Sequence, residues 1–196
     1  VFRSQAVAQS GDSDTSTLAG EDSMEADADP DYLEVDRLFK DKCYQDASQR
    51  CIRALAQRDQ LGTADASWQR MAELLTALRY VMGEYEKAVP LMQKLLVGLD
   101  QDSTKYFDRL SKLGGLYQKM GDFEHAERYY DQAMELRLRH LGEAHEDYMH
   151  SLSYLSALYR KMGAYDKAEA CMLRISQLRG WDLHEPTEQK EREDFS

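Results

Sequence analysis

The sequence predicts an all-α protein, a right-handed α-solenoid of about four helical hairpins, from two observations. From residue 30 onward the apolar residues recur with the period of a helix, and no window alternates as a strand does. Residues 113–137 also match residues 155–179 at a shift of 42, and residues 75–96 match 113–134 at a shift of 38. Residues 43–55 are a fainter copy. Self-similarity at such a period is typical of stacked helical repeats.

The charges divide the chain into three parts. The 196 residues include 25 Lys+Arg and 36 Asp+Glu, giving a formal net charge of −11. Residues 1–31 and 180–196 carry all of this excess, while residues 32–179 are balanced. We therefore expect an acidic disordered tail over 1–29, a repeat domain over 30–179, and a capping segment with an acidic tail over 180–196.

Two classes of partner are excluded by composition. A nucleic-acid-binding domain needs a basic face, whereas the body of this chain is neutral and the sequence pI is about 4.9. No run of residues approaches the 18 apolar residues that a membrane-spanning helix requires, so direct membrane insertion is not expected.

Each repeat is predicted to be a hairpin of two helices. In the third unit, Gly121 supplies the left-handed conformation that ends the first helix, and Asp122 caps the second. A small residue then faces the partner helix, so that the two backbones can approach. The four alanines at this recurring position are Ala47, Ala88, Ala126 and Ala168.

Eight helices follow from this pattern. Asp29 and Pro30 provide a capping acid and a first-turn proline for the first of them. Lys42 stands where later units have the turn glycine, and Pro90 should bend the fourth helix or lie in its first turns. The predicted ranges are 30–41, 44–58, 66–82, 84–98, 103–120, 122–141, 145–162 and 164–179.

The unit resembles the tetratricopeptide repeat (TPR). The residues that carry the resemblance recur in the third and fourth units, while Arg79 replaces the first-helix tyrosine in the second. They are Gly114, Tyr117, Gly121, Phe123, Ala126, Tyr130 and Ala133, then Ser156, Tyr159, Gly163, Tyr165, Ala168, Met172 and Ile175. The long period and Pro90 are similar to the kinesin light chain and nephrocystin type of repeat. The resemblance covers about residues 31–179 and implies a TPR solenoid that binds protein partners.

No pattern in the sequence indicates a reaction. His145 and His150 in HEDYMH lie five residues apart, which puts them about 140° apart on a helix, so they do not share a zinc ion. Gly114 and Gly115 lie inside a helix and not in a phosphate-binding turn. We expect no catalytic residue, no metal, no cofactor and no small-molecule substrate. Most methionines and tyrosines are expected in the core, among them Met71, Met92, Tyr117, Met120, Tyr130, Tyr159 and Met172.

The cysteines and the absence of asparagine favour an intracellular location. The three cysteines form no C-x-x-C motif, and a chain without asparagine has no N-glycosylation acceptor. We expect the cytoplasm, or the interior of an organelle if Val1 follows a removed transit peptide.

The first helices of successive units should line the concave groove, which is the expected binding face. The small residues in the middle of these helices, Ala77, Gly115 and Ala157, either leave a channel for a peptide or permit tight helix packing. Kinesin light chain repeats commonly hold a ligand backbone through asparagines, which this chain lacks. The candidate residues are Arg70, Glu73, Tyr80, Asp108, Ser111, Lys119, His150, Ser153, Arg160 and Lys161, with Trp181 beyond the last repeat.

The sequence thus predicts a non-enzymatic interaction module that binds a peptide or a folded subunit through its groove or edge. The module acts either as an adaptor or as a structural subunit of a larger assembly. An alternative is a regulatory peptide-recognition module that controls an associated enzyme or motor. Trp181 is expected to fold over the last helix as a cap, with exposure to a partner, or occupation of a groove, as the other options.

Overall fold

The computed structural model describes residues 29–60 and 66–180, and these form eight helices with no strand among them. The two acidic tails, and with them Trp181, lie outside the described residues apart from Asp29 and Gly180. The helices are α1 (Pro30–Lys40), α2 (Tyr44–Gln60), α3 (Ala66–Val81), α4 (Tyr85–Leu96), α5 (Thr104–Met120), α6 (Phe123–Leu141), α7 (Glu146–Met162) and α8 (Tyr165–Leu178).

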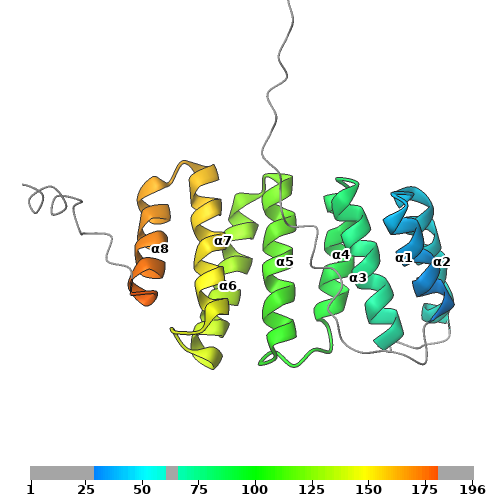
Figure 1. The fold of residues 1–196 in the computed structure, drawn as a ribbon, viewed down its shortest axis with the longest axis horizontal. Helices are drawn as coiled ribbons and strands as arrows, with labels where there is room; N and C mark the ends of the chain where they lie inside the picture. Colours follow the sequence, from blue (N-terminus) through cyan, green and yellow to red (C-terminus); the bar gives the residue numbers. More distant parts are fainter. Residues whose placement is uncertain (1–28, 61–65, 181–196) are drawn as a thin grey trace, which may run out of the picture.

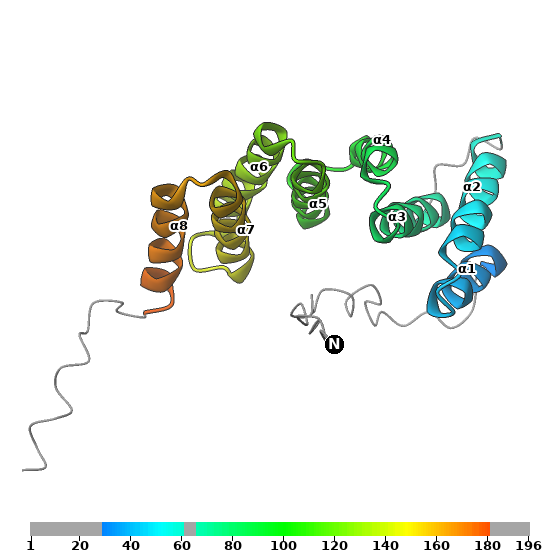
Figure 2. The same cartoon turned by 90° about the horizontal axis from the view of Figure 1, so that it is seen from above.

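The helices pack as four antiparallel hairpins in a row, which confirms the predicted solenoid (Figure 1). Each helix packs mainly against the one before it and the one after it in the chain. Figure 2 shows the row curving into an arch, with α3, α5 and α7 on its inner side and α4 and α6 on its outer side. We call the surface of α3, α5 and α7 on this side the inner face.

Local signals in the sequence set the ends of the helices. The Asp122 side chain accepts a hydrogen bond from the backbone N–H of His125 at 3.2 Å, as the capping argument predicts. Gly121 and Gly163 end α5 and α7 with φ of 81° and 76°. In the first hairpin Lys42 adopts the same left-handed conformation, with φ of 61°, although it carries a side chain. Pro90 is the sixth residue of α4.

The side chain of Asp29 ties the first three helices together. It accepts hydrogen bonds from the backbone N–H of Asp31 at 3.0 Å and from Ser67 Oγ at 2.7 Å, and it pairs with Arg58. Burial by itself raises the pKa of the Asp29 carboxyl, but these hydrogen bonds and the charge of Arg58 outweigh it and lower the pKa. The N-terminus of α1 is thereby fixed to the end of α2 and the start of α3.

The core runs along the contact between the two helices of each hairpin. The four recurring alanines are buried, with 0% exposure at Ala126 and 4% at Ala168. Gly114 of α5 lies against the ring of Tyr130 of α6, so that a Cβ atom there would approach the ring to 2.7 Å. Two residues predicted to pack in the core do not: Met120 is 39% exposed and Met172 is 51% exposed. Met120 precedes the turn glycine at a helix end, and Met172 lies on the side of α8 that no later described helix covers.

Candidate protein-binding face

The predicted binding residues fall at equivalent positions of α3, α5 and α7. In the repeat register, Arg70 corresponds to Asp108 and His150, and Tyr80 corresponds to Gln118 and Arg160. The middle position holds Ala77, Gly115 and Ala157, none of which is buried. A Cβ at Gly115 would lie at an ordinary contact distance of 3.5 Å from the Tyr130 hydroxyl. Helix packing therefore requires a glycine at position 114 but not at position 115.

Two buried arginines hold the acidic groups of this face. Arg109 of α5 is 5% exposed and donates hydrogen bonds to the Leu95 carbonyl and, at 2.7 Å, to the Glu73 carboxylate. It stands where the neighbouring units have Met71 and Ser151, a core position. Burying a cation is costly unless it is paired, so Glu73 serves as the counter-ion of the core arginine.

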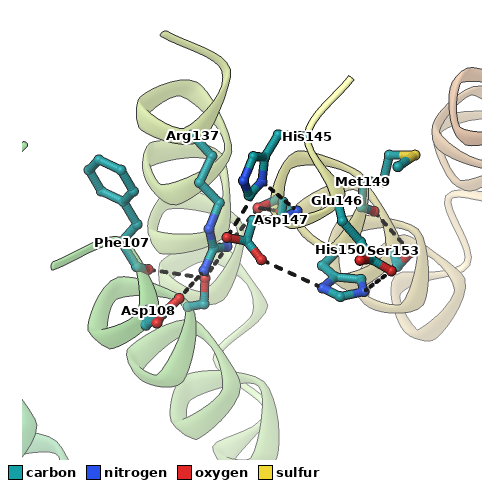
Figure 3. A network of polar contacts seen from close by, with 11 residues as sticks. Phe107, Asp108, Arg137, His145, Glu146, Asp147, Met149, His150 and Ser153 are labelled. Atoms are coloured by element: carbon teal, nitrogen blue, oxygen red, sulfur yellow. Dashed lines mark hydrogen bonds and ion pairs between the residues drawn. The ribbon is translucent and has the colours of Figure 1, made fainter. Parts of the chain in front are cut away.

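Arg137 of α6 is the second buried arginine, and it binds the acidic residue Asp108 of α5 (Figure 3). It is 4% exposed and donates to Ser111 Oγ at 2.9 Å, Ser151 Oγ at 2.7 Å and the Asp108 carboxylate at 2.5 Å. Arg137 thereby joins α5, α6 and α7.

The contact between Arg137 and Ser111 corrects the expectation that Ser111 lines the binding groove. Ser111 is 9% exposed beneath Arg137 and donates its own hydroxyl to the Phe107 carbonyl, so it does not line the open surface. Its counterpart Ser153 is exposed and donates to the Met149 carbonyl at 3.0 Å. The difference arises because α5 is covered by the following unit, whereas no later unit follows α7 and α8 within the described residues.

Three tyrosines from three helices meet above α5. The ring of Tyr130 stacks on that of Tyr154 with centroids 5.6 Å apart and planes 16° apart. Burial raises the pKa of Tyr130, and the nearby Tyr154 and Tyr80 raise it further. Tyr130 is 4% exposed and donates to Gln118 Oε1 at 3.2 Å, whereas Tyr80 and Tyr154 are 39% and 46% exposed. The inner face thus presents two tyrosine rings beside a floor formed by Gly115.

One cation lies beside these rings, and two more are exposed on α7. The ammonium of Lys119 lies 5.5 Å from the centroid of the Tyr80 ring, a cation–π distance. Arg160 and Lys161 are exposed at the C-terminal end of α7. Within residues 29–60 and 66–180, neither of these two forms an ion pair, and the same holds for Arg70 and Lys112.

The opposite end of the face, at the start of α7, is acidic and rich in histidine (Figure 3). His145 caps α7 by accepting a hydrogen bond from the Asp147 N–H at 3.2 Å through Nδ1. His150 lies 3.9 Å from the carboxylate of Glu146 and 4.0 Å from that of Asp147. Among the described residues, no group of three or more His, Cys, Asp or Glu is arranged to hold a metal ion.

The edge of the solenoid carries a separate pocket of about 310 Å³. It lies between the α3–α4 and α5–α6 turns, and its lining includes Tyr85, Met120 and Asp122. None of the predicted binding residues lines it.

No helix of the described part is long and apolar enough to cross a membrane.

The structure therefore brings part of the predicted set together. Tyr80 and Lys119 are in contact with each other, and Arg160 and Lys161 lie at the same end of the neighbouring helix. Sequence reasoning missed Arg109, Arg137 and Tyr154. The signal for Arg109 was a charged residue at a core position of the repeat, and the signal for Tyr154 was an aromatic ring at the position that Lys112 occupies one unit earlier.

Comparison with known proteins supports the repeat assignment. Residues 109–179 match the tetratricopeptide repeat family. A search of curated proteins finds no match to the sequence.

Solved structures of similar fold include three repeat proteins. The crystal structure of BtubC (BKLC) from P. vanneervenii has a TM-score of 0.63 at 24% identity, covering 76% of this chain. The matched region spans 63% of BtubC, which is less than two thirds of its length. The structure of nearly identical TPR-like repeats of the kinesin light chain type from Podosopora anserina has a TM-score of 0.69 at 15% identity. The match covers 80% of this chain and 79% of that one.

MamA gives a TM-score of 0.55 at 16% identity, covering 78% of this chain and 81% of MamA. Identities this low establish the shared fold alone. Together with the family match over residues 109–179, these likenesses show that the described part of the chain has a TPR-like repeat fold.

Proposed function

We propose that the chain is a non-enzymatic protein–protein interaction module, an adaptor or a subunit of a larger assembly, that binds an acidic protein segment on its inner face. TPR folds in general mediate protein–protein interactions and are typically non-enzymatic. Fold alone does not identify a binding surface, so the proposal depends on the chemistry of this face.

The observation that carries the proposal is the unequal pairing of charges. Glu73 and Asp108, the acidic members of the predicted binding set, are each bound by a buried arginine at 2.7 and 2.5 Å. Arg160 and Lys161 form no ion pair in the described part of the chain. The end of the face at the C-terminus of α7 thus has uncompensated positive charge, and a negatively charged segment is the complement of that end.

A charge-reversal experiment tests the proposal. The probe is a fluorescein-labelled acidic peptide, (Ala-Gly-Glu)₄, whose binding is followed by fluorescence anisotropy at low and at moderate salt. The test variant carries Arg160→Glu and Lys161→Glu. The matched control carries Arg128→Glu and Arg139→Glu, two exposed arginines on α6, which form no ion pair with described residues.

Both variants change the net charge by the same amount, so a general loss of attraction affects them equally. We expect the test variant to bind the peptide at least tenfold more weakly, while the control stays within about twofold of the parent, with a salt dependence that disappears only in the test variant. Equal losses in both variants, or no loss in either, would reject the inner face as the acidic-segment site.

A further inference from the structure

We propose that the segment recognised by the inner face is an amphipathic helix that lies antiparallel along α7, with acids at its own N-terminal end and bases at its C-terminal end. This inference rests on the proposed function and names the form and the charge order of the segment. It follows from the exposed side chains of α7, which change from acidic to basic along one side of the helix.

One stripe of side chains runs the length of α7. Its members are three or four residues apart, which places them on the same side of the helix. They are Asp147, His150, Tyr154, Ala157 and Lys161, and we call them the α7 stripe. All are exposed except Asp147, which is half-buried. The α7 stripe is therefore one continuous surface that a partner can contact.

The N-terminal end of the α7 stripe is acidic. Glu146 and Asp147 stand in the first turn of α7 (Figure 3). Among the described residues, their ion-pair contacts are to the rings of His145 and His150 at 3.6 to 4.0 Å, which is longer than a hydrogen bond. Neither carboxylate is paired with a lysine or an arginine of the described part, so both can accept from a cation of a partner.

The C-terminal end of the α7 stripe is basic. Arg160 and Lys161 are exposed there and form no ion pair with described residues. At a rise of about 1.5 Å per residue, Asp147 and Arg160 lie about 20 Å apart along the helix axis. A partner that pairs with both ends must therefore carry charges of opposite sign at a similar separation.

An aromatic ring lies midway between the two charged ends. Tyr154 is 46% exposed, and its ring is held in place because it stacks on the buried Tyr130 with centroids 5.6 Å apart. Acids in the first turn and bases in the last turn stabilise a helix through its dipole, so the charges of α7 alone do not define a binding surface. The exposed ring between them does not contribute to that effect, and it offers an apolar contact to a partner.

An antiparallel helix is the complement of these three features. The dipole of the partner helix favours acids in its first turn and bases in its last turn. In the antiparallel alignment its acids lie over Arg160 and Lys161, and its bases lie over the acidic end of the α7 stripe. The charge order that stabilises the partner helix is thus the order that α7 attracts. A helix of about 15 residues spans the α7 stripe with its backbone groups already paired, whereas an extended chain needs hydrogen-bond partners for them.

Three fluorescein-labelled peptides with amidated C-termini test the charge order and the helix. The first, EEAQALAQLAQAAKK, carries acids at its start, leucines in its middle and bases at its end. The second, EKAQALAQLAQAAKE, has the same composition with the charges mixed at both ends. The third, EEAQALPQLAQAAKK, keeps the charge order and breaks the helix with a central proline. By fluorescence anisotropy, we expect the first peptide to bind at least tenfold more tightly than either of the others.

Charge-removal variants locate the acidic end of the site. Glu146→Gln combined with Asp147→Asn should weaken binding of the first peptide at least fivefold and should not weaken binding of (Ala-Gly-Glu)₄. The same variant should bind EEAQALAQLAQAAQQ, which lacks the lysines, within twofold of the parent. The matched control combines Glu124→Gln and Glu135→Gln, two exposed acids of α6 that form no ion pair with described residues, and should bind the first peptide within twofold of the parent.

A tyrosine variant locates the middle of the site. Tyr154→Ala should weaken binding of the first peptide at least threefold, because it removes the ring against which the leucines pack. The control is Tyr165→Ala, which removes a 69% exposed tyrosine of α8 and should leave binding within twofold of the parent. Equal losses in the two variants would place the apolar contact elsewhere and contradict the alignment along α7.

The outcomes separate this inference from the proposed function. Equal affinity for the first and second peptides would overturn the charge order, and equal affinity for the first and third would overturn the helix. An equal effect of the charge-removal variant and its control would overturn the contact with Glu146 and Asp147. Each of these results leaves the acidic-segment site standing. If Arg160→Glu with Lys161→Glu weakened neither the first peptide nor (Ala-Gly-Glu)₄, this inference and the proposed function would both fail.

Discussion

Alanine substitution at two adjacent glycines should change stability in opposite directions. A Cβ at position 114 would lie 2.7 and 2.8 Å from two carbons of the Tyr130 ring, well inside contact distance. The ring cannot easily move away, since it is 4% exposed, stacks on Tyr154 and donates to Gln118. Such overpacking costs about 1–3 kcal/mol. Replacing Gly by Ala inside a helix contributes about 1 kcal/mol in the other direction.

Gly114→Ala should therefore lower the free energy of unfolding by about 1 kcal/mol. In Gly115→Ala the new Cβ contacts only the Tyr130 hydroxyl, at an ordinary 3.5 Å. This substitution should therefore raise the free energy of unfolding by about 0.5–1 kcal/mol. The difference between the two variants is the cost of the clash itself.

Urea unfolding followed by helical circular dichroism measures both values, and for a domain of this size about 1 kcal/mol corresponds to roughly 2–4 °C in melting temperature. If both variants are stabilised to the same extent, the close contact between α5 and Tyr130 is refuted. A near-ultraviolet circular dichroism signal that changes only in Gly114→Ala would show independently that the tyrosine stack has moved.

Three further predictions concern the rest of the solenoid. Ala126→Leu and Ala168→Leu should each lower the free energy of unfolding by about 1–3 kcal/mol, because both alanines are buried between the helices of a hairpin. An unchanged melting temperature would show that they do not pack there. The pKa of Asp29 is lowered in the folded chain, so ionised Asp29 stabilises the fold. This stabilisation is present above the unfolded pKa and is lost as the pH falls through the folded pKa. Asp29→Asn should therefore flatten the acid side of the stability curve measured by urea unfolding, and an unaltered acid limb would contradict this. Trp181, outside the described residues, should give blue-shifted fluorescence in a Trp68→Phe background if it caps the last helix, whereas a red-shifted, easily quenched emission would refute the cap.

The helices could be predicted from the sequence because their ends depend on local signals. All eight begin and end within two residues of the predicted bounds, since the turn glycines, the capping acids and Pro30 act on neighbouring backbone. Even Lys42 takes the conformation expected of the glycine that it replaces.

The details of the binding face could not be predicted in the same way. The contacts of Arg137 reach across 14, 26 and 29 residues, and they exist only because α6 packs between two first helices. A helical period shows which side of a helix is polar, but not whether the next repeat covers that side. Ser111 and Ser153 hold equivalent positions in the sequence, yet only Ser153 is exposed.

The placement of the arginines also explains how a repeat domain with balanced charge can present a charged face. Residues 32–179 contain equal numbers of acids and bases, which by itself suggests no electrostatic preference. Arg109 and Arg137 are buried and pair with Glu73 and Asp108, so they compensate these two acids from within the core. The exposed cations at the C-terminal end of α7 are then left without a carboxylate partner among the described residues, because Glu146 and Asp147 lie at the other end of that helix. Replacing a single core arginine should for this reason alter both the stability of the solenoid and the charge that it presents to a partner.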